Sequence, residues 1–163
     1  MRFILVDRIL GIEKGREGSF LKNVSQSEDY FTDHFPESPI MPGVLILESF
    51  DQASQFLVAS SHGFTRYPEL KQVLRVTFRH YVLPGDQLQI YLNIASEDNE
   101  KIVINASAKV HEKIAAEATL LFNLVPEGCD PEAKAHCKRL EHFYDLLSAD
   151  PLGRAWEGLI GHF

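Results

Sequence analysis

The chain has 163 residues, a length that suits one well-buried core with a short appendage better than two domains. Its 45% hydrophobic and 24% charged residues are typical of a globular protein and exclude a largely disordered one. The formal net charge of -7 argues against nucleic-acid binding, which usually relies on a basic surface.

The first residues do not have the pattern of an export or membrane segment. Their longest apolar stretch, residues 3–6, is too short for the core of a signal peptide and far too short to span a membrane. We therefore expect a cytoplasmic protein without a membrane segment. Cys129 and Cys137 are separated by eight positions, which is a poor basis for a disulfide framework, so we expect free thiols.

The first half of the chain predicts two short strands followed by one long helix. Residues 3–12 and 18–24 have strand character and flank a turn-like segment with two glycines. A polar segment comes next, with room for one helical turn at residues 28–31. Pro42 suits a helix start because its fixed φ fits the first helical position. Residues 43–60 continue without proline and are at first apolar on nearly every side, so we expect surrounding elements to enclose this helix.

The second half predicts a series of longer strands. The runs with strand character are residues 71–82, 86–96, 101–111 and 113–125, separated by turn-forming segments. In the first run apolar side chains alternate with basic ones, which indicates a half-buried strand with a basic outer face. The apolar positions are Leu74, Val76 and Phe78, and the basic positions are Lys71, Arg75 and Arg79. Together these elements predict an α+β domain in which antiparallel strands wrap one long buried helix.

After residue 126 the pattern changes to that of short amphipathic helices. Asp130 can cap a helix whose apolar positions recur every three or four residues, namely Ala133, Cys137, Leu140, Tyr144 and Leu147. Residues 152–163 repeat this pattern. We therefore divide the chain into a domain of residues 1–126 and a C-terminal helical extension of residues 127–163, whose apolar faces must pack against another surface.

The extension also holds side chains that could suggest a zinc site. They are Cys129, His136, Cys137 and His142, and their spacing fits no standard zinc finger. Cys137 also lies on the apolar stripe of the predicted helix. We therefore expect no metal site.

The segment HFPESPIMPGVLILE, residues 34–48, combines the residue types of an acid–base site. His34 can serve as a general base because histidine titrates near neutral pH. Glu48 shares a face of the predicted helix with Gln52, and loss of solvation there would favour its protonated form and let it donate a proton. Between them, the N–H groups at Gly43 could hold a carbonyl oxygen that gains negative charge. This set suits removal of a proton beside a thioester carbonyl with loss of a β-hydroxyl as water.

Plainer interpretations of these residues remain open. Glu48 could be a buried glutamate tied to a partner across an oligomer interface. His34 is one of seven histidines, most of which would be surface residues or satisfied core residues.

The same segment closely resembles the signature of the (3R)-3-hydroxyacyl-acyl carrier protein dehydratases of bacterial fatty-acid synthesis, the FabZ type with its FabA relatives. In that family a histidine in HFP and an acid in the central helix are 14 positions apart, as His34 and Glu48 are here. RFILVDRILGIEKG resembles the family's opening strand, and VTFRHYVLPGDQL resembles its FRxPVxPGDxL stretch. The resemblance covers roughly residues 1–125 and implies the hot-dog fold, in which an antiparallel sheet wraps a long central helix.

The resemblance implies a role for each matching residue. His34 abstracts the α-proton of the acyl chain, and Glu48 protonates the departing hydroxyl. The backbone N–H of Gly43 polarises the thioester carbonyl, and Gln52 matches a family glutamine that orients the acid. The family acts without a cofactor and builds its site across a dimer, so a homodimer or a larger assembly such as a hexamer is expected.

The substrate implied by the resemblance is carried on the phosphopantetheine arm of acyl carrier protein. The basic strand face of Lys71, Arg75 and Arg79 could receive this acidic partner by local charge. A merely solvated sheet face is a nearly equal alternative.

The sequence departs from the family near the site. Glu37 follows HFP where the family usually has glycine, and ESFDQ replaces EALAQ, which puts Phe50 and Asp51 near the acid. The extension has no counterpart in the family. These departures bear on the range of substrates. Two other activities stay open on the same fold: an acyl thioesterase, and a non-catalytic subunit that binds an acyl chain or a partner protein.

Overall fold

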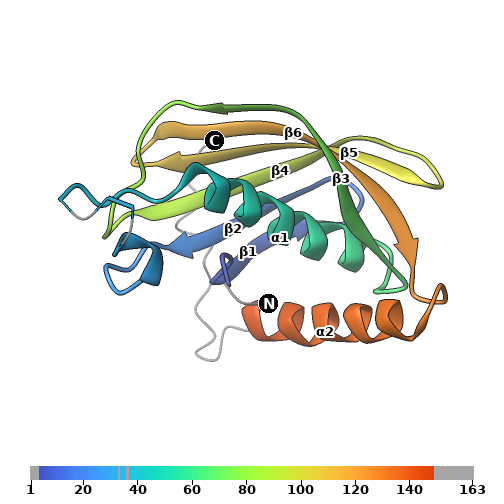
Figure 1. Cartoon of the computed structure of the whole chain (residues 1–163). Helices are drawn as coiled ribbons and strands as arrows, with labels where there is room; N and C mark the ends of the chain where they lie inside the picture. Colours follow the sequence, from blue (N-terminus) through green and yellow to red (C-terminus); the bar gives the residue numbers. More distant parts are fainter. Residues whose placement is uncertain (1–3, 33, 36, 149–163) are drawn as a thin grey trace.

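The computed structural model describes residues 4–32, 34–35 and 37–148. The elements in chain order are β1 (Arg8–Glu13), β2 (Glu17–Asn23), the 3-10 turn η1 (Asp29–Phe31), α1 (Gly43–Ser61), β3 (Arg66–Phe78), β4 (Gln87–Glu97), β5 (Lys101–Val110), β6 (Lys113–Pro126) and α2 (Pro131–Ser148). Figure 1 shows α1 lying against one side of the sheet, with α2 next to both α1 and β1. The predicted α+β arrangement of a sheet around one long helix is confirmed.

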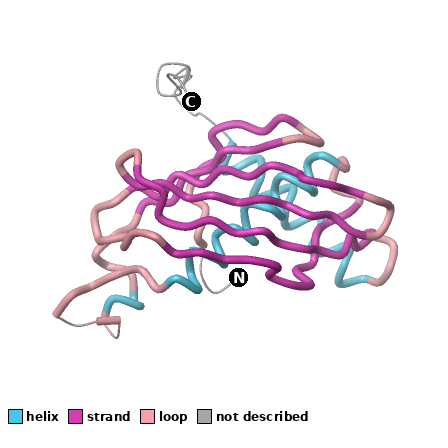
Figure 2. The backbone as a smooth tube through the Cα atoms, turned by 90° about the horizontal axis from the view of Figure 1, so that it is seen from above, coloured by secondary structure: helices cyan, strands magenta, loops and turns pink. Residues whose placement is uncertain are grey.

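The strands form one six-stranded sheet in the order β1-β2-β4-β5-β6-β3, and every neighbouring pair is antiparallel. Seen from above in Figure 2, the strands run across the molecule while the helices lie behind them. β1 and β3 are the edge strands, so the outer edge of β3 has no strand beside it within the described part of the chain.

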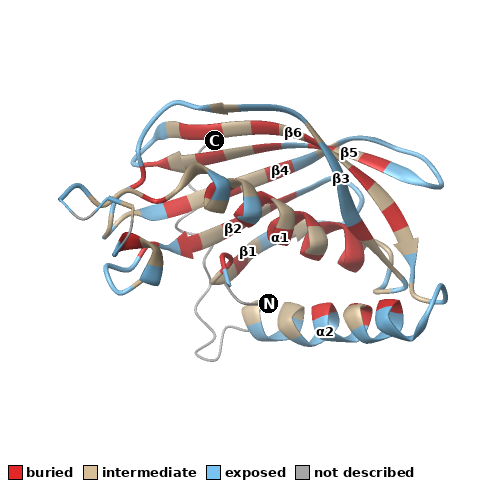
Figure 3. Cartoon of the chain, in the orientation of Figure 1, coloured by how far each residue is buried: buried red, intermediate tan, exposed pale blue. Residues whose placement is uncertain are grey.

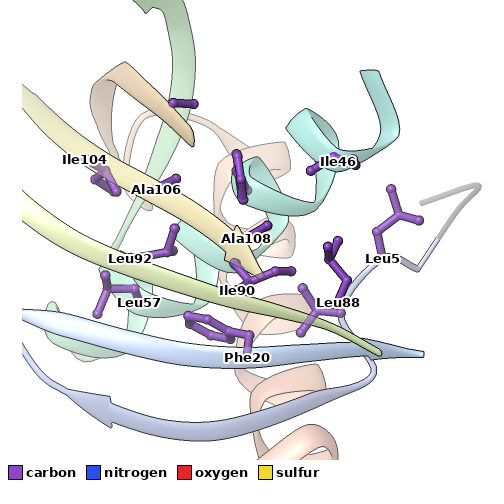
Figure 4. Close-up of a cluster of buried hydrophobic side chains, with 14 of the residues drawn as sticks. Leu5, Phe20, Ile46, Leu57, Leu88, Ile90, Leu92, Ile104, Ala106 and Ala108 are labelled. Carbon is purple, nitrogen blue, oxygen red and sulfur yellow. The ribbon is translucent and has the colours of Figure 1, made fainter. Parts of the chain in front are cut away.

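The core lies between the sheet and α1. Alternate residues of the central strands are buried, as expected when one face of a strand packs against a helix. Phe50, Ala53 and Leu57 of α1 are fully buried against them. Figure 4 shows this cluster, in which Phe20 and Ile90 from neighbouring strands point toward the helix. Each large side chain buried in this way stabilises the fold by roughly 1.5–3 kcal/mol.

α1 is enclosed on every side only in its second half, where residues 56–60 are all buried. In the first half Ile46, Ser49 and Phe50 are buried, whereas Val44 is 70% exposed and Glu48 is also exposed. Figure 3 shows this gradient along the helix. The prediction that α1 is enclosed all round is therefore wrong for the single chain. The first turns of α1 carry the apolar residues that led to this prediction, but the other described elements of the chain do not cover all of them.

β3 begins at Arg66, five residues before the predicted start, and includes Pro68. Proline lacks the N–H that a central strand would need, and an edge strand tolerates this loss. Two bulges, at residues 70–72 and 73–75, shift the pairing with β6. Beyond them, Val76 pairs with Ala118 and so faces the helix.

α2 confirms the predicted first helix of the extension. The Ala133 N–H donates to Asp130 Oδ1 at 2.7 Å, which is the expected N-cap bond. Ala133, Cys137 and Leu140 are buried where α2 packs against α1 and β1. The second predicted helix, residues 152–163, lies outside the described residues. None of the described helices is long and apolar enough to cross a membrane.

Candidate active site

His34 lies in the loop between η1 and α1 and is partly buried. Its backbone N–H donates to the Tyr30 carbonyl at 3.1 Å, and its carbonyl accepts the Ile40 N–H at 3.2 Å. The Nδ1 atom of the ring lies 3.1 Å from the Ile40 carbonyl oxygen. A carbonyl can only accept, so Nδ1 carries the proton and Nε2 of the neutral ring keeps its lone pair. This arrangement fixes the tautomer that a general base requires.

The loop that carries His34 is tied to the rest of the domain at its far end. The Met41 N–H donates to the Val82 carbonyl at 2.8 Å, and the Met41 side chain is buried. Within the loop, Ser38 N–H donates to the Phe35 carbonyl at 3.0 Å, and Glu37 is exposed in this turn. The side chain of Glu37 therefore extends into solvent at the position where the family usually has glycine.

α1 begins directly after this loop. Pro42 is the N-cap and Gly43 the first helical residue, one position later than predicted. A Cβ added to Gly43 would lie 2.9 Å from the Phe78 ring of β3, so this close approach requires glycine unless the ring moves. The Leu45 N–H donates to the Pro42 carbonyl at 2.9 Å. The N–H groups of the first two helical positions lie too close to the helix start to have an acceptor within the helix, which leaves that of Gly43 able to bind a ligand oxygen.

Glu48 is held by the predicted glutamine. The Gln52 side-chain Nε2 donates to Glu48 Oε1 at 2.9 Å, and Gln52 Oε1 accepts the Leu5 N–H at 2.9 Å. Gln52 is only 2% exposed, so its amide is fixed between the backbone before β1 and the carboxylate. Glu48 itself is exposed, and the predicted burial of this carboxylate is therefore wrong for the single chain.

Asp51, three residues further along α1, is a carboxylate that the chain partly buries. Burial raises its pKa to about 6, with a smaller contribution in the same direction from the charge of Glu48, while a hydrogen bond from Gln55 opposes the change. Gln55 Nε2 donates to Asp51 Oδ2 at 2.9 Å, whereas Oδ1 is buried and has no hydrogen-bond partner among the residues that the structure describes. The sequence indicated that Asp51 lies near the acid but not that it is partly buried.

The three predicted basic residues of β3 are all exposed. Arg75 and Arg79 line the same shallow hollow on the outer face of the sheet, and Lys71 sits at the first bulge, outside that hollow. Arg79 also forms an ion pair with Glu117 at 2.7 Å. Both side chains are about half exposed, so the pair contributes little to stability.

The candidate metal ligands of the extension are dispersed. Cys129 is exposed and Cys137 is buried in the α2 interface, and both are free thiols. His136 bonds to Gln55 of α1. Among the described residues, no group of three or more histidine, cysteine, aspartate or glutamate side chains is placed to hold a metal ion.

Comparison with protein families gives one match, to a model described as a FabA-like domain, over residues 1–119. A 3-hydroxyacyl-[acyl-carrier-protein] dehydratase FabZ from Pelotomaculum thermopropionicum is 41% identical over 121 residues, which cover 74% of this chain and 86% of the relative. The enzyme of the same name from Symbiobacterium thermophilum is 40% identical over 131 residues, or 80% of this chain and 92% of the relative. α2 begins beyond the family match.

Solved structures agree on the fold. A hot-dog-like protein from Thermanaerovibrio acidaminovorans aligns with a TM-score of 0.61 at 16% identity and covers 78% of this chain and 93% of its own. A Streptococcus mutans protein bound to acetyl-CoA gives the same TM-score at 18% identity, over 77% of this chain and 94% of its own. At such identities these likenesses show the hot-dog fold alone.

Proposed function

Because the chain belongs to the FabA-like family of 3-hydroxyacyl-[acyl-carrier-protein] dehydratases, we propose that the segment from His34 to Gln52 carries out this dehydration. The protein removes water from a 3-hydroxyacyl chain attached to acyl carrier protein in fatty-acid biosynthesis. We propose the (3R)-3-hydroxyacyl group as the substrate and the trans-2-enoyl group as the product.

His34 is the general base of this reaction. Its Nδ1–H bond to the Ile40 carbonyl leaves the Nε2 lone pair for the α-proton of the acyl chain, and this is the observation that carries the proposal. The same bond holds the ring in place and stabilises the positive charge that the imidazole gains on accepting the proton.

Glu48 is the general acid. Once the α-proton has left, the C–O bond at the β-carbon breaks and Glu48 protonates the departing hydroxyl, which leaves as water. Gln52 orients the carboxyl by donating to one oxygen, so the other oxygen can carry the proton. The N–H of Gly43 binds the thioester oxygen, on which negative charge develops during proton removal.

A homodimer would complete this site. At the β3 edge of the sheet, Leu74, Val76 and Phe78 are 37–49% exposed, although the β6 residues that pair with Val76 and Phe78, Ala118 and Ala116, are buried. At the start of α1, the exposed Val44 and the partly buried Leu45 and Leu47 form a second apolar surface. We propose that a second copy covers both, so that His34 of one protomer meets Glu48 of the other.

The carrier protein would dock beside the site through charge. Arg75 and Arg79 supply positive charge on the outer face of the sheet, and Lys71 supplies it near the first bulge. Since Arg79 is already paired with Glu117, Arg75 and Lys71 would contribute more to attracting an acidic partner.

The test replaces the two reacting side chains. His34→Ala and Glu48→Gln should each lower enoyl formation by about 100-fold or more, because each removes a group that transfers a proton. Turnover is measured by mass spectrometry of a chain-length series of 3-hydroxyacyl carrier-protein substrates. His142→Ala and Glu141→Gln, both on the exposed face of α2, are matched controls that should retain wild-type rates.

Two results would contradict the proposal. Wild-type rates in both site variants would remove His34 and Glu48 from the reaction. Release of free carrier-protein thiol instead of the enoyl product would identify a thioesterase on the same fold.

A further inference from the structure

Lys22 is a buried charged side chain that the proposed reaction does not use. It lies two positions after Phe20 on β2, so both side chains project from the strand face that packs toward α1. Lys22 is 5% exposed, and its pairing partner on β4, Leu88, is fully buried. An ammonium group is costly to bury unless other groups bind it, so its partners indicate what it does.

Two carboxylates bind the Lys22 ammonium group. Its Nζ atom lies 2.8 Å from Glu28 Oε1 and 3.4 Å from Asp7 Oδ2. The Glu28 and Asp7 side chains are 24% and 31% exposed, so this ion cluster is partly shielded from solvent. Asp7 Oδ2 also accepts the Asn23 N–H at 2.6 Å. The ion cluster of Lys22, Asp7 and Glu28 therefore joins the end of β2 to the segment before β1 and to the segment that leads into η1.

Glu28 connects the ion cluster to the loop that carries His34. It is the N-cap of η1, but its side chain makes no capping bond with that turn and binds Lys22 instead. The Glu28 carbonyl accepts the Phe31 N–H at 3.1 Å, and the Tyr30 carbonyl accepts the His34 N–H at 3.1 Å. A continuous path through η1 thus leads from the Lys22 ammonium group to the backbone of His34.

Phe31 is the other anchor of η1. Its side chain is 5% exposed and belongs to the hydrophobic core. A 3-10 turn of three residues is held weakly by its own hydrogen bonds, so a single apolar anchor leaves it free to rotate. Glu28, three residues before Phe31, supplies a second point of attachment. The orientation of η1 therefore depends on the ion cluster as well as on the core.

We propose that the ion cluster positions the general base. Lys22 holds Glu28, Glu28 sets the orientation of η1, and η1 sets the place of the His34 ring. Lys22 and Glu28 are thus positioning residues that act through His34 and do not touch the substrate. The inference rests on the proposed function for the role of His34.

The bonds that hold the proposed acid do not involve Glu28. Gln52 donates to Glu48 and accepts the Leu5 N–H. When Glu28 is replaced, Asp7 still binds the lysine, so the segment before β1 and its bond to Gln52 stay in place. Loss of the Glu28 carboxylate should therefore displace the base and leave the acid where it is.

The experiment measures steady-state kinetics of the full chain with 3-hydroxyacyl carrier-protein substrates. Replacing Lys22 would leave two carboxylates without their cation and destabilise the fold, so the test replaces Glu28. Glu28→Ala should lower kcat by about tenfold or more, because a small displacement of a reacting group has a large effect on rate. KM should change by less than about twofold, since the Gly43 N–H that binds the thioester is not attached to Glu28.

Two further variants separate positioning from a general loss of structure. Glu28→Gln keeps an acceptor oxygen for Lys22 and should retain most of the wild-type kcat. Glu97→Ala is the matched control, because Glu97 is also partly buried, at 30% exposure, and also lies 2.8 Å from its partner, His62. That pair lies at the other end of α1 from the site, so Glu97→Ala should keep the wild-type kcat.

Nitrogen NMR of the histidine rings separates this inference from the proposed function. At about pH 8.5, where imidazole is neutral, His34 should carry its proton on Nδ1, as the bond to the Ile40 carbonyl requires. In Glu28→Ala this signal should become that of a mixture of both tautomers, whether or not the protein turns over substrate.

Four results decide between the interpretations. Wild-type kcat in Glu28→Ala, or an unchanged His34 signal in that variant, would overturn the positioning role. An equal loss of kcat in Glu28→Gln or in Glu97→Ala would overturn it as well, because neither change removes the support of η1. A wild-type protein that forms no enoyl product would instead contradict the proposed function, and the His34 signal would still test the link from Glu28.

Discussion

Two carboxylates on α1 are each held by the glutamine four residues later. Glu48 is bound by Gln52 and Asp51 by Gln55, as side chains one turn apart on a helix allow. Solvation separates the two pairs: Glu48 is exposed in the single chain, whereas Asp51 is partly buried. Neighbouring carboxyls in unlike environments can differ in their affinity for a proton.

The buried charge of Asp51 should lower the stability of the protein at neutral pH. Folding raises the pKa of this carboxyl from 3.8 to about 6. The folded state thus binds the proton more tightly, and stability falls as pH rises between these two values. Asp51→Asn has no such titration, so near pH 7.5 it should be more stable than the wild type by on the order of 2 kcal/mol. Urea unfolding at a series of pH values measures this difference.

The pH dependence of the stability difference between Asp51→Asn and the wild type tests whether the titration of Asp51 is its cause. The difference should shrink as the pH falls from about 6 to 3.8 and vanish below 3.8, where Asp51 is protonated in both folded and unfolded chains. Asp145→Asn, at an exposed position, should show little difference at any pH. A constant difference, or an Asp51→Asn protein that is less stable near pH 7.5, would mean that Asp51 has a stabilising charge partner.

At the scale of elements, periodicity predicted most of the fold. α1 and the strands β4, β5 and β6 begin and end within one or two residues of their predicted bounds, because alternating apolar residues and turn-forming segments delimit them. β3 was less predictable. Its first five residues include Pro68, and its two bulges interrupt the alternation that the sequence pattern assumes.

The site could be predicted only as far as local spacing reaches. The pairing of Glu48 with Gln52 follows from their separation along one helix, and the loop position of His34 follows from the polar segment that precedes this helix. The bond between Gln55 and His136 joins residues 81 positions apart, and no local pattern encodes it. The exposure of Glu48 could not be predicted either, because it depends on which parts of α1 the rest of the fold covers.

The N-cap of α2 should contribute measurably to stability. Asp130→Ala removes the acceptor of the Ala133 N–H and should lower the free energy of unfolding by about 1 kcal/mol. Asp145→Ala, near the other end of the same helix, is the matched control and should cost nothing, since an acidic side chain there opposes the helix dipole. Thermal or urea unfolding checks both variants. Equal stability of Asp130→Ala and wild type would show that α2 does not unfold together with the rest of the domain.

At the scale of the whole molecule, one chain covers only part of its central helix. The sheet and α2 enclose the second half of α1, while Val44 and Glu48 in the first half are exposed. The apolar edge of β3 is exposed as well. An open strand edge and an exposed apolar helix face are both liabilities for a lone chain, and a second copy placed on them would remove both.

A mixture of two inactive variants tests whether the site is shared. In a hybrid dimer of His34→Ala and Glu48→Gln chains, one site would carry both substitutions and the other would carry neither. Random pairing makes half of the dimers hybrid, so refolding the variants together should restore about a quarter of wild-type activity. Each variant refolded alone is the control and should stay inactive.

The result of the mixing experiment depends on whether the His34 and Glu48 of one site come from the same chain or from two chains. If His34 and Glu48 of the same chain formed the site, every site in the mixture would carry one substitution, and no activity would return. Activity that returns only after the chains have been exchanged, and not on simple mixing of folded dimers, would identify the second copy as the surface that covers the exposed residues at the start of α1. The first turns of α1 would then be apolar because they pack against another protomer.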